Sequence, residues 1–151
     1  MPTSAAPTFG LSDPDLIRDT CFIAGTWRGA AAGRTFAVQN PATGDVVGHV
    51  PDCGREETRD AIDAASNACN DWRERTADER ASLLHRWAQL LYAHQADLAR
   101  LMTLEQGKPL AEANGEVAYA AQFIDWFAEE GKRAYGAVSY THLTLPTSDL
   151  V

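Results

Sequence analysis

The stretch Leu104-Glu105-Gln106-Gly107-Lys108-Pro109-Leu110, called the joint below, connects two strongly patterned segments of the chain. Gly107 can adopt the left-handed conformation that closes a helix, because it has no Cβ atom. Pro109 suits the first position of a helix, where its missing N–H is no loss. The joint therefore predicts that one helix ends at residue 106 and that another begins at Pro109.

The sequence after the joint predicts the longest helix, over residues 109–135. Its apolar residues recur at spacings of three and four, which is typical of one buried face. This stripe consists of Val117, Ala120, Ala121, Ile124, Phe127 and Ala128, and Phe123 and Trp126 widen it. Such a helix has about 27 residues and is on the order of 40 Å long. We therefore expect it to lie across a body larger than this chain.

Three more helices are predicted before the joint, over residues 55–72, from about residue 77, and over residues 95–106. The second follows a capping box, in which the Thr76 hydroxyl accepts from the Glu79 backbone N–H and the Glu79 side chain accepts from the Thr76 N–H. The faces expected to be buried are Thr58, Ile62, Ala65, Cys69 and Trp72 in the first helix, Leu83, Leu84, Trp87, Leu90 and Leu91 in the second, and Leu98, Leu101 and Met102 in the third.

The N-terminal third of the chain lacks the helical periodicity of the rest and contains short β-prone runs. Residues 1–11 are rich in Ala, Pro, Thr and Ser and predict a mobile tail, and residues 12–18 predict one or two helical turns. The β-prone runs at residues 21–24, 35–39 and 45–50 are separated by turns that contain glycine. They are expected to form a small antiparallel meander.

Two glycine-containing turns lie between these runs. In Asn40-Pro41-Ala42-Thr43-Gly44, called the Asn-Pro turn below, proline fixes one φ angle and Gly44 supplies a positive one. Gly29-Ala30-Ala31-Ala32-Gly33-Arg34-Thr35 is faintly similar to a phosphate-binding loop. It has one residue too few between the glycines, carries Arg34 in place of lysine, and leads into a predicted strand. We interpret it as a turn.

The joint resembles the Glu-x-Gly-Lys-Pro segment of aldehyde dehydrogenases, and the Asn-Pro turn resembles their Asn-Pro-x-Thr-Gly turn. Residues 110–130 look most like the succinate-semialdehyde dehydrogenase branch. The resemblance implies an α/β fold, of which this chain is a mostly helical N-terminal part, with residues 12–136 in the cofactor-binding domain. Residues 137–151 depart from the family. We expect them to be an artefact of a truncated reading frame; the alternative is a real divergent tail that forms an edge strand.

For the complete enzyme, the resemblance implies oxidation of a small aldehyde to a carboxylic acid with NAD or NADP, in a homo-oligomer. The reaction uses a cysteine nucleophile, a glutamate that activates water, and an asparagine that stabilises the oxyanion. The family places these groups and its cofactor motif beyond the end of this sequence. We therefore expect no catalytic and no cofactor-binding residue in this chain, no tight cofactor binding, and no activity on its own.

The resemblance also implies one metal site. Related enzymes hold a monovalent cation with backbone carbonyls before the Asn-Pro turn and with the acidic residue of the joint. These would be Val38, Gln39 and Glu105. Oxygen ligands suit a hard cation. The alternative is that Glu105 is a surface acid at the end of a helix.

Other residues that could carry chemistry are interpreted as structural. Cys21, Cys53 and Cys69 fit neither a disulfide framework nor a zinc site, and we expect free, mostly buried thiols. Cys69 has no histidine adjacent to activate it. The remaining candidates are expected on the surface; they are the histidines His85 and His94, the pair Glu112 and Glu116, and the acids Asp125, Glu129 and Glu130.

The overall composition excludes some classes of partner. The formal net charge is -8 and the hydrophobic content is 45%, so the chain offers no basic field for nucleic acid or an anionic membrane. No stretch is apolar enough to suggest a membrane span, and the cytoplasm is the expected location. The rival hypothesis to an enzyme fragment is a non-catalytic helical module that binds a partner through the stripe after the joint.

Overall fold

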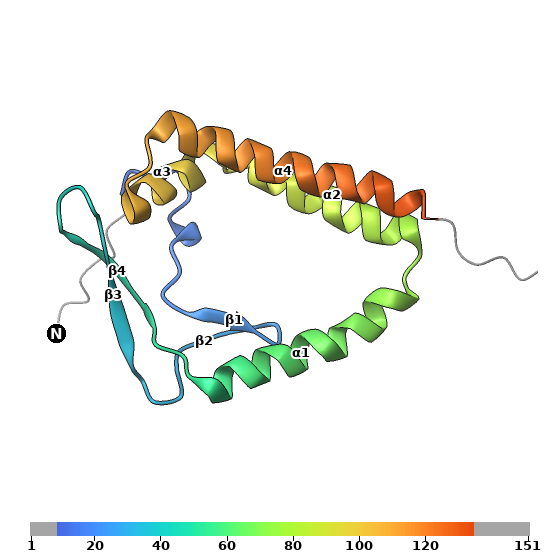
Figure 1. The fold of residues 1–151 in the computed structure, drawn as a ribbon, viewed down its shortest axis with the longest axis horizontal. Coiled ribbons are helices and arrows are strands. Elements are labelled where there is room, and N and C mark those ends of the chain that lie inside the picture. The colour runs from blue at the N-terminus through green and yellow to red at the C-terminus, as the bar shows by residue number, and fades with distance from the viewer. Residues whose placement is uncertain (1–8, 135–151) are drawn as a thin grey trace, which may run out of the picture.

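The computed structural model describes residues 9–134, which form four helices and four short strands (Figure 1). In chain order the elements are a 3-10 turn at Pro14–Leu16, strands β1 (Cys21–Ile23), β2 (Thr26–Arg28), β3 (Thr35–Gln39) and β4 (Val46–Pro51), and helices α1 (Arg55–Glu74), α2 (Ala77–Ala93), α3 (Gln95–Gln106) and α4 (Leu110–Lys132). All four predicted helices are present. Residues 1–8 of the predicted tail 1–11, and the whole predicted segment 137–151, lie outside the described residues.

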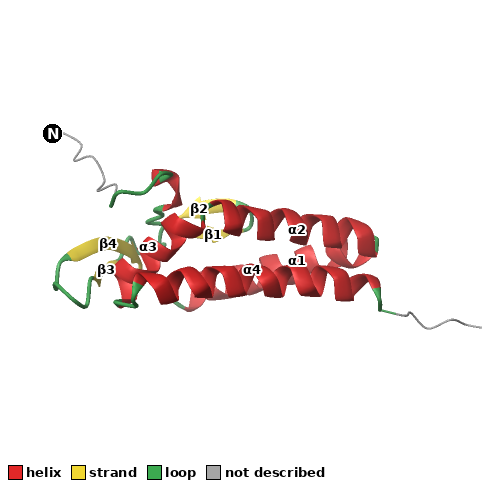
Figure 2. Cartoon of the chain, turned by 90° about the horizontal axis from the view of Figure 1, so that it is seen from above, coloured by secondary structure: helices red, strands yellow, loops and turns green. Residues whose placement is uncertain are grey.

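Helices α2, α3 and α4 pack together, and α1 lies apart from them. Figures 1 and 2 both show α4 alongside α2, running in the opposite direction, and α3 lies under the start of α4. The main tertiary contact of α1 is with β1. No helix within residues 9–134 has the length and apolar character needed to span a bilayer.

The strands form two separate antiparallel hairpins. Strand β1 pairs with β2, and β3 pairs with β4. The predicted antiparallel strands are present, but they form two separate sheets and not the expected single meander. The chain reverses directly after Ile23, so β1 pairs with the additional strand β2 and not with β3. Ala24 and Gly25 both have positive φ angles, 53° and 78°. Two such residues make the tight turn that suits a hairpin, and this turn creates β2.

The ends of α2 and α4 lie at or near the positions that their capping residues predict. Thr76 Oγ1 accepts from the Glu79 N–H at 3.2 Å, and Glu79 Oε2 accepts from the Thr76 N–H at 2.8 Å, so the predicted capping box is confirmed. Helix α4 begins at Leu110, one residue after the predicted start, with Pro109 as its N-cap, and it ends at Lys132. It therefore has 23 residues, fewer than expected.

The helix contacts are made by small side chains. The buried apolar residues of the helices are Ala81, Ala88, Ala99, Ala113, Val117, Ala121 and Ala128. Because alanine leaves little between two helix backbones, helices that bury alanines can pack closely. Ala99 of α3 clusters with Ala113 and Val117 of α4, and the buried residues of α2, which packs on α4, are Ala81 and Ala88. The centre of the packing is a line of alanines, with one valine, and not the large apolar residues of the predicted stripe.

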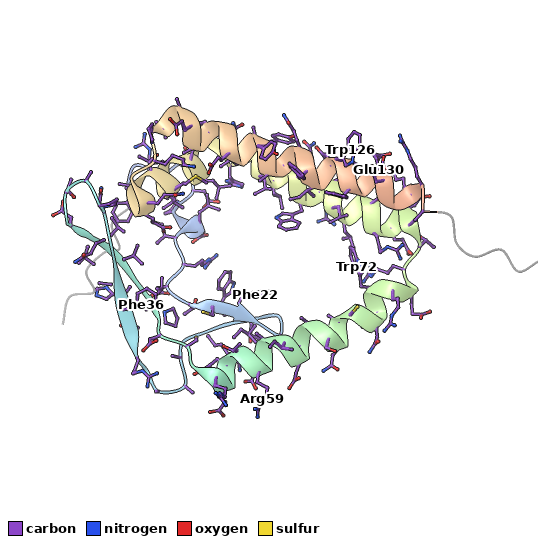
Figure 3. All side chains as sticks on the ribbon, viewed as in Figure 1. Phe22, Phe36, Arg59, Trp72, Trp126 and Glu130 are labelled. Carbon is purple, nitrogen blue, oxygen red and sulfur yellow. The ribbon has the colours of Figure 1, made fainter. Side chains whose placement is uncertain are left out.

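Many residues predicted to be buried are in fact exposed, and this corrects the sequence analysis. The exposed members of the predicted faces are Thr58, Ile62, Ala65, Cys69, Trp72, Leu83, Trp87, Leu90, Ala120, Phe123, Trp126 and Phe127. Figure 3 shows Trp126 projecting outward from α4, and Phe22 and Trp72 projecting from β1 and α1 toward the side where α2 lies. The apolar pattern was found correctly, but no element within residues 9–134 covers these faces.

Candidate functional site

The joint has the geometry that its sequence predicts. Gly107 follows α3 in the left-handed conformation, with a φ angle of 74°, and its N–H donates to the Thr103 carbonyl at 2.9 Å. This hydrogen bond satisfies a carbonyl group that the end of a helix would otherwise leave unpaired. The chain then turns into α4 within two residues. The prediction that Gly107 ends one helix is confirmed.

The Asn-Pro turn is closed by its own hydrogen bonds. The Asn40 N–H donates to the Asp45 carbonyl and the Gly44 N–H donates to the Asn40 carbonyl, each at 2.8 Å. The Asn40 side chain accepts from the Ala42 N–H at 2.9 Å, and Gly44 has a φ angle of 78°. The predicted turn is therefore confirmed, with asparagine adding a local bond that proline and glycine alone do not provide.

The Asn-Pro turn lies against the joint. A Cβ atom placed on Gly107 would be only 2.8 Å from Cγ of Pro41. Glycine at position 107 is therefore required twice, by its φ angle and by the contact with Pro41. Two segments that are more than 60 residues apart in the sequence meet here.

A cavity of about 170 Å³ lies beside this contact, between α3, the β3–β4 hairpin and the N-terminal segment. Val38 and Glu105 both line it, together with Arg18 and Asp19, so the structure brings two of the three predicted cation ligands to one place. Gln39, the third, is the next residue of β3 and does not line the cavity. The β3–β4 register shifts between Val38 and Gln39, so the ladder is irregular at this point.

The cysteines differ from the prediction. Cys69 is exposed on α1, and Cys21 and Cys53 are half-buried, so the expectation of mostly buried thiols is wrong. The reason for Cys69 is that no element in the described part of the chain covers its face of α1. Cys21 and Cys53 lie beside each other, with 3.8 Å between their Sγ atoms.

Two buried carboxylates, missed in the sequence, tie the N-terminal segments to the helices. Asp97 of α3 accepts from the backbone N–H groups of Ser12 and Asp13 at 2.9–3.0 Å. Glu57 of α1 accepts from those of Ala31 at 2.7 Å and Gly54 at 2.8 Å. Backbone hydrogen bonds, led by Ser12 for Asp97 and by Ala31 for Glu57, hold the pKa of both carboxyl groups below their usual values. These acids are structural ties.

His85 was predicted as a surface histidine, but it links two helices. Its Nδ1 atom lies 2.8 Å from Asp125 Oδ1 and its Nε2 atom lies 2.7 Å from Glu129 Oε1, both on α4. The hydrogen bond to Asp125 and then that to Glu129 raise the pKa of His85. Asp125 and Glu129 are four residues apart, a spacing that places both on one face of α4. That spacing was the available signal for a partner.

The other expected surface groups remain outside any site. Glu116 forms an ion pair with Lys108 of the joint, and Glu130 forms one with Arg133. Glu112 is exposed. Within residues 9–134, no group of three or more His, Cys, Asp or Glu side chains is arranged to hold a metal ion.

Replacing His85 with glutamine is expected to change how stability depends on pH. Because the pKa of His85 is raised on folding, the link stabilises fully below about pH 6.5 and is lost as the pH rises through the raised pKa. The side chain is 36% exposed, so the effect is modest, about 1–2 °C in Tm. The Tm should be measured at steps of about one pH unit between about pH 5 and about pH 9. As the pH rises, the Tm of H85Q should fall less than that of the parent chain. H49Q, at an exposed position, is the control, and an identical fall in Tm for H85Q and H49Q would contradict the link.

The family model described as the aldehyde dehydrogenase family matches residues 27–148 of the chain. This range contains the Asn-Pro turn and the joint, and it also includes most of the 137–151 segment that was expected to depart from the family. The match covers far more than half of the sequence.

Comparison with individual relatives gives the same family as the family model. The chain is 59% identical over 126 residues to the succinate-semialdehyde dehydrogenase (NADP(+)) of Escherichia coli, and 58% identical over 126 residues to the glutarate-semialdehyde dehydrogenase of Pseudomonas putida; each alignment covers 83% of this chain and 26% of the relative. The crystal structure of succinate-semialdehyde dehydrogenase from Burkholderia pseudomallei superposes with a TM-score of 0.82 at 52% identity, covering 93% of this chain and 28% of that one. The chain thus spans about a quarter of the length of its relatives. It belongs to the aldehyde dehydrogenase family.

Proposed function

We propose that this chain is a scaffold part of an NAD(P)-dependent aldehyde dehydrogenase that oxidises succinate semialdehyde to the corresponding carboxylic acid. The packing of the Asn-Pro turn on Gly107 carries the proposal, because both segments resemble the family and their contact requires glycine. The names of the two relatives refer to succinate and glutarate semialdehyde, which are both aldehydes with a terminal carboxylate. Their high identity to this chain supports the same class of substrate.

The described residues do not fit a dinucleotide by themselves. Such a site needs a glycine-rich turn between a strand and the N-terminus of a helix, where backbone N–H groups face the phosphates. The turn at residues 29–35 leads into strand β3, and the strands described in residues 9–134 form only antiparallel hairpins. We therefore assign binding of the cofactor, and the reacting groups, to parts of the whole protein outside these residues.

The role that we assign to this chain is mechanical. The joint fixes the angle between α3 and α4, the Asn-Pro turn holds the joint, and Asp97 fastens the N-terminal segment to α3. The exposed apolar faces of α1, α2 and α4 are surfaces that the remainder of the enzyme would cover. In the whole protein we also expect assembly into a homo-oligomer.

We further propose that the carbonyls of Val38 and Gln39 and the carboxylate of Glu105 contribute to a monovalent cation site of the whole enzyme. Val38 and Glu105 line one cavity, and the strand ladder is irregular between Val38 and Gln39. An irregularity of this kind can leave a backbone carbonyl outside the ladder. Oxygen donors suit a hard cation. In an active full-length protein, E105Q should raise the potassium concentration needed for half-maximal thermal stabilisation; an unchanged potassium dependence would contradict this assignment.

A chimeric enzyme tests the proposed function. In it, the region of the Escherichia coli enzyme that aligns with this chain is replaced by the aligned residues of this chain. We expect the kcat/KM for succinate semialdehyde with NADP to stay within about tenfold of the parent, a loss below ~1.4 kcal/mol of barrier. A folded chimera of the parent's oligomeric state that lacks this activity would contradict the proposal.

One observation favours the alternative, a helical interaction module. Four aromatic residues of α4 form an exposed face, called the aromatic face; they are Tyr119, Phe123, Trp126 and Phe127. The rings of Tyr119 and Phe123 meet edge to face, with 4.7 Å between their centroids. Exposed patches of this kind commonly bind protein. Size-exclusion chromatography of the chain tests this alternative: a stable, partner-free monomer would count against the module and also against an exposed apolar core.

A further inference from the structure

Cys21 and Cys53 form a pair of free thiols that the chemistry proposed above does not use. Cys21 is the first residue of β1, and Cys53 lies between β4 and α1. They are 32 positions apart in the sequence, yet their Sγ atoms are 3.8 Å apart and both residues are half-buried. Two sulfur atoms at this distance are in van der Waals contact.

The surrounding backbone holds the two cysteines in this arrangement. Cys21 pairs with Arg28 across the β1–β2 hairpin. The residue after Cys53 is Gly54, whose N–H donates to Glu57, and the same carboxylate accepts from Ala31, which follows β2. The Glu57 side chain therefore connects the segment beside Cys53 to the hairpin that carries Cys21. The strand pairing beside Cys21 and the Glu57 hydrogen bonds beside Cys53 therefore keep the two sulfur atoms in contact.

We propose that Cys21 and Cys53 are a modification site, at which a peroxide converts the two thiols into a reversible disulfide. The Sγ atoms must approach by about 1.8 Å to reach the ~2.05 Å length of the bond. Rotation about the Cα–Cβ bond of one or both cysteines moves the Sγ atom, which is bonded to Cβ, by a distance of this size.

The reaction needs two steps and one peroxide molecule. In the first, a thiolate attacks one peroxide oxygen, so that an S–O bond forms and the O–O bond breaks; the departing hydroxide takes up a proton and leaves as water. In the second, the other sulfur attacks this sulfenic acid, so that the S–S bond forms and the S–O bond breaks. The thiol proton leaves with the hydroxide as a second water. Two thiols lose two electrons in total, and the peroxide gains them.

Either cysteine can carry out the first step, because the two sulfur atoms lie in contact. Burial, and then the hydrogen bond with Cys21, raise the pKa of the Cys53 thiol. Whichever thiol the peroxide oxidises, the other lies in position for the second step. Disulfides of this reversible kind are the ones expected in a reducing compartment.

The disulfide would fasten the start of α1 to the first hairpin. Near this point the described ties are the Glu57 hydrogen bonds and the ion pair between Arg28 and Asp60, which is 2.9 Å long. The rest of α1 lies apart from α2 and α4 (Figure 1). Oxidation would therefore restrict the position of α1, the helix with the fewest contacts in the described part of the chain.

Peptide mapping tests the proposal on the full 151-residue chain. Trypsin places the three cysteines in separate peptides, 19–28 for Cys21, 35–55 for Cys53 and 60–73 for Cys69. After treatment with hydrogen peroxide and blocking of remaining thiols, we expect a linked 19–28/35–55 species, about 2 Da lighter than the two peptides together. Dithiothreitol should abolish it, and C69S should form it as fully as the parent chain.

Two single variants complete the test. C21S and C53S should yield none of the linked species, and they should lose the slower hydrogen exchange that oxidation is expected to give the first turn of α1. The proposal would be overturned if peroxide produced only sulfinic or sulfonic acids at Cys21 and Cys53, or if the only disulfides were those that join chains through Cys69.

Discussion

Gly107→Ala is expected to destabilise the chain by about 2–5 kcal/mol. Part of the cost is conformational, because a residue with a Cβ atom pays roughly 1–2 kcal/mol to hold a left-handed φ angle such as the 74° at Gly107. The rest is steric, because the new Cβ would lie 2.8 Å from Pro41 Cγ, and overpacking of this kind costs about 1–3 kcal/mol. Urea unfolding followed by circular dichroism measures the change.

Gly115→Ala is the matched control, since Gly115 lies within α4 and a Cβ atom there meets nothing within 4 Å. Alanine at a helix interior is favoured over glycine by about 1 kcal/mol, so this variant should be neutral or more stable. The double variant P41A/G107A should recover the steric part of the loss and leave the conformational part. Equal effects of the Gly107 and Gly115 changes would show that the joint is not constrained as described.

Ala121→Leu is expected to destabilise the packing of α2 against α4 by about 2–3 kcal/mol. Ala121 is 0% exposed, and α2, which packs against α4, buries only alanines, Ala81 at 2% and Ala88 at 0% exposed. Three added carbon atoms at this contact have no space to occupy, so the helices must separate or adopt strained side-chain conformations. The free energy of unfolding in urea gives the size of the effect.

Ala120→Leu, one residue earlier on α4, is the control for this change. Ala120 is exposed, and leucine and alanine have similar helix propensities, so the stability should change by less than about 0.5 kcal/mol. The sequence pattern had placed both alanines in one buried stripe. Large losses of similar size at Ala120 and Ala121 would restore that assignment and contradict the packing in the structure.

The elements that sequence reasoning located correctly are those determined by local chemistry. The joint, the Asn-Pro turn and the capping box at Thr76 depend on interactions within about five residues, so their signals are complete in the sequence. The family resemblance rested on the first two of these and on residues 110–130, which follow the joint. The same locality explains why the helix limits were found to within a few residues.

What sequence reasoning missed depends on contacts between distant segments. The periodicity that identified the stripe on α4 does not say which side of it meets another helix, and the side that does is marked by alanines and not by aromatic residues. Likewise, Glu57, His85 and Asp97 each look like ordinary surface residues until the fold supplies partners that are 26, 40 and 85 positions away. Their roles could not be read from the residues themselves.

The candidate cation site was predicted in part: it was neither found from local sequence chemistry nor missed altogether. Its residues came from the family resemblance, and the structure places Val38 and Glu105 at one cavity while Gln39 stays beside it. Backbone carbonyls leave no trace in a sequence, because every residue has one. Only a resemblance could name them in advance.

The scaffold role of this chain is tested most directly by an assay of the purified 151-residue protein with succinate semialdehyde and either NAD or NADP, following the absorbance of the reduced nicotinamide. The Escherichia coli enzyme serves as the positive control. We predict a rate equal to that of buffer alone, because the reacting groups are assigned to other parts of the whole enzyme. Turnover that rises in proportion to the concentration of this chain, and that alkylation of its thiols abolishes, would contradict the assignment.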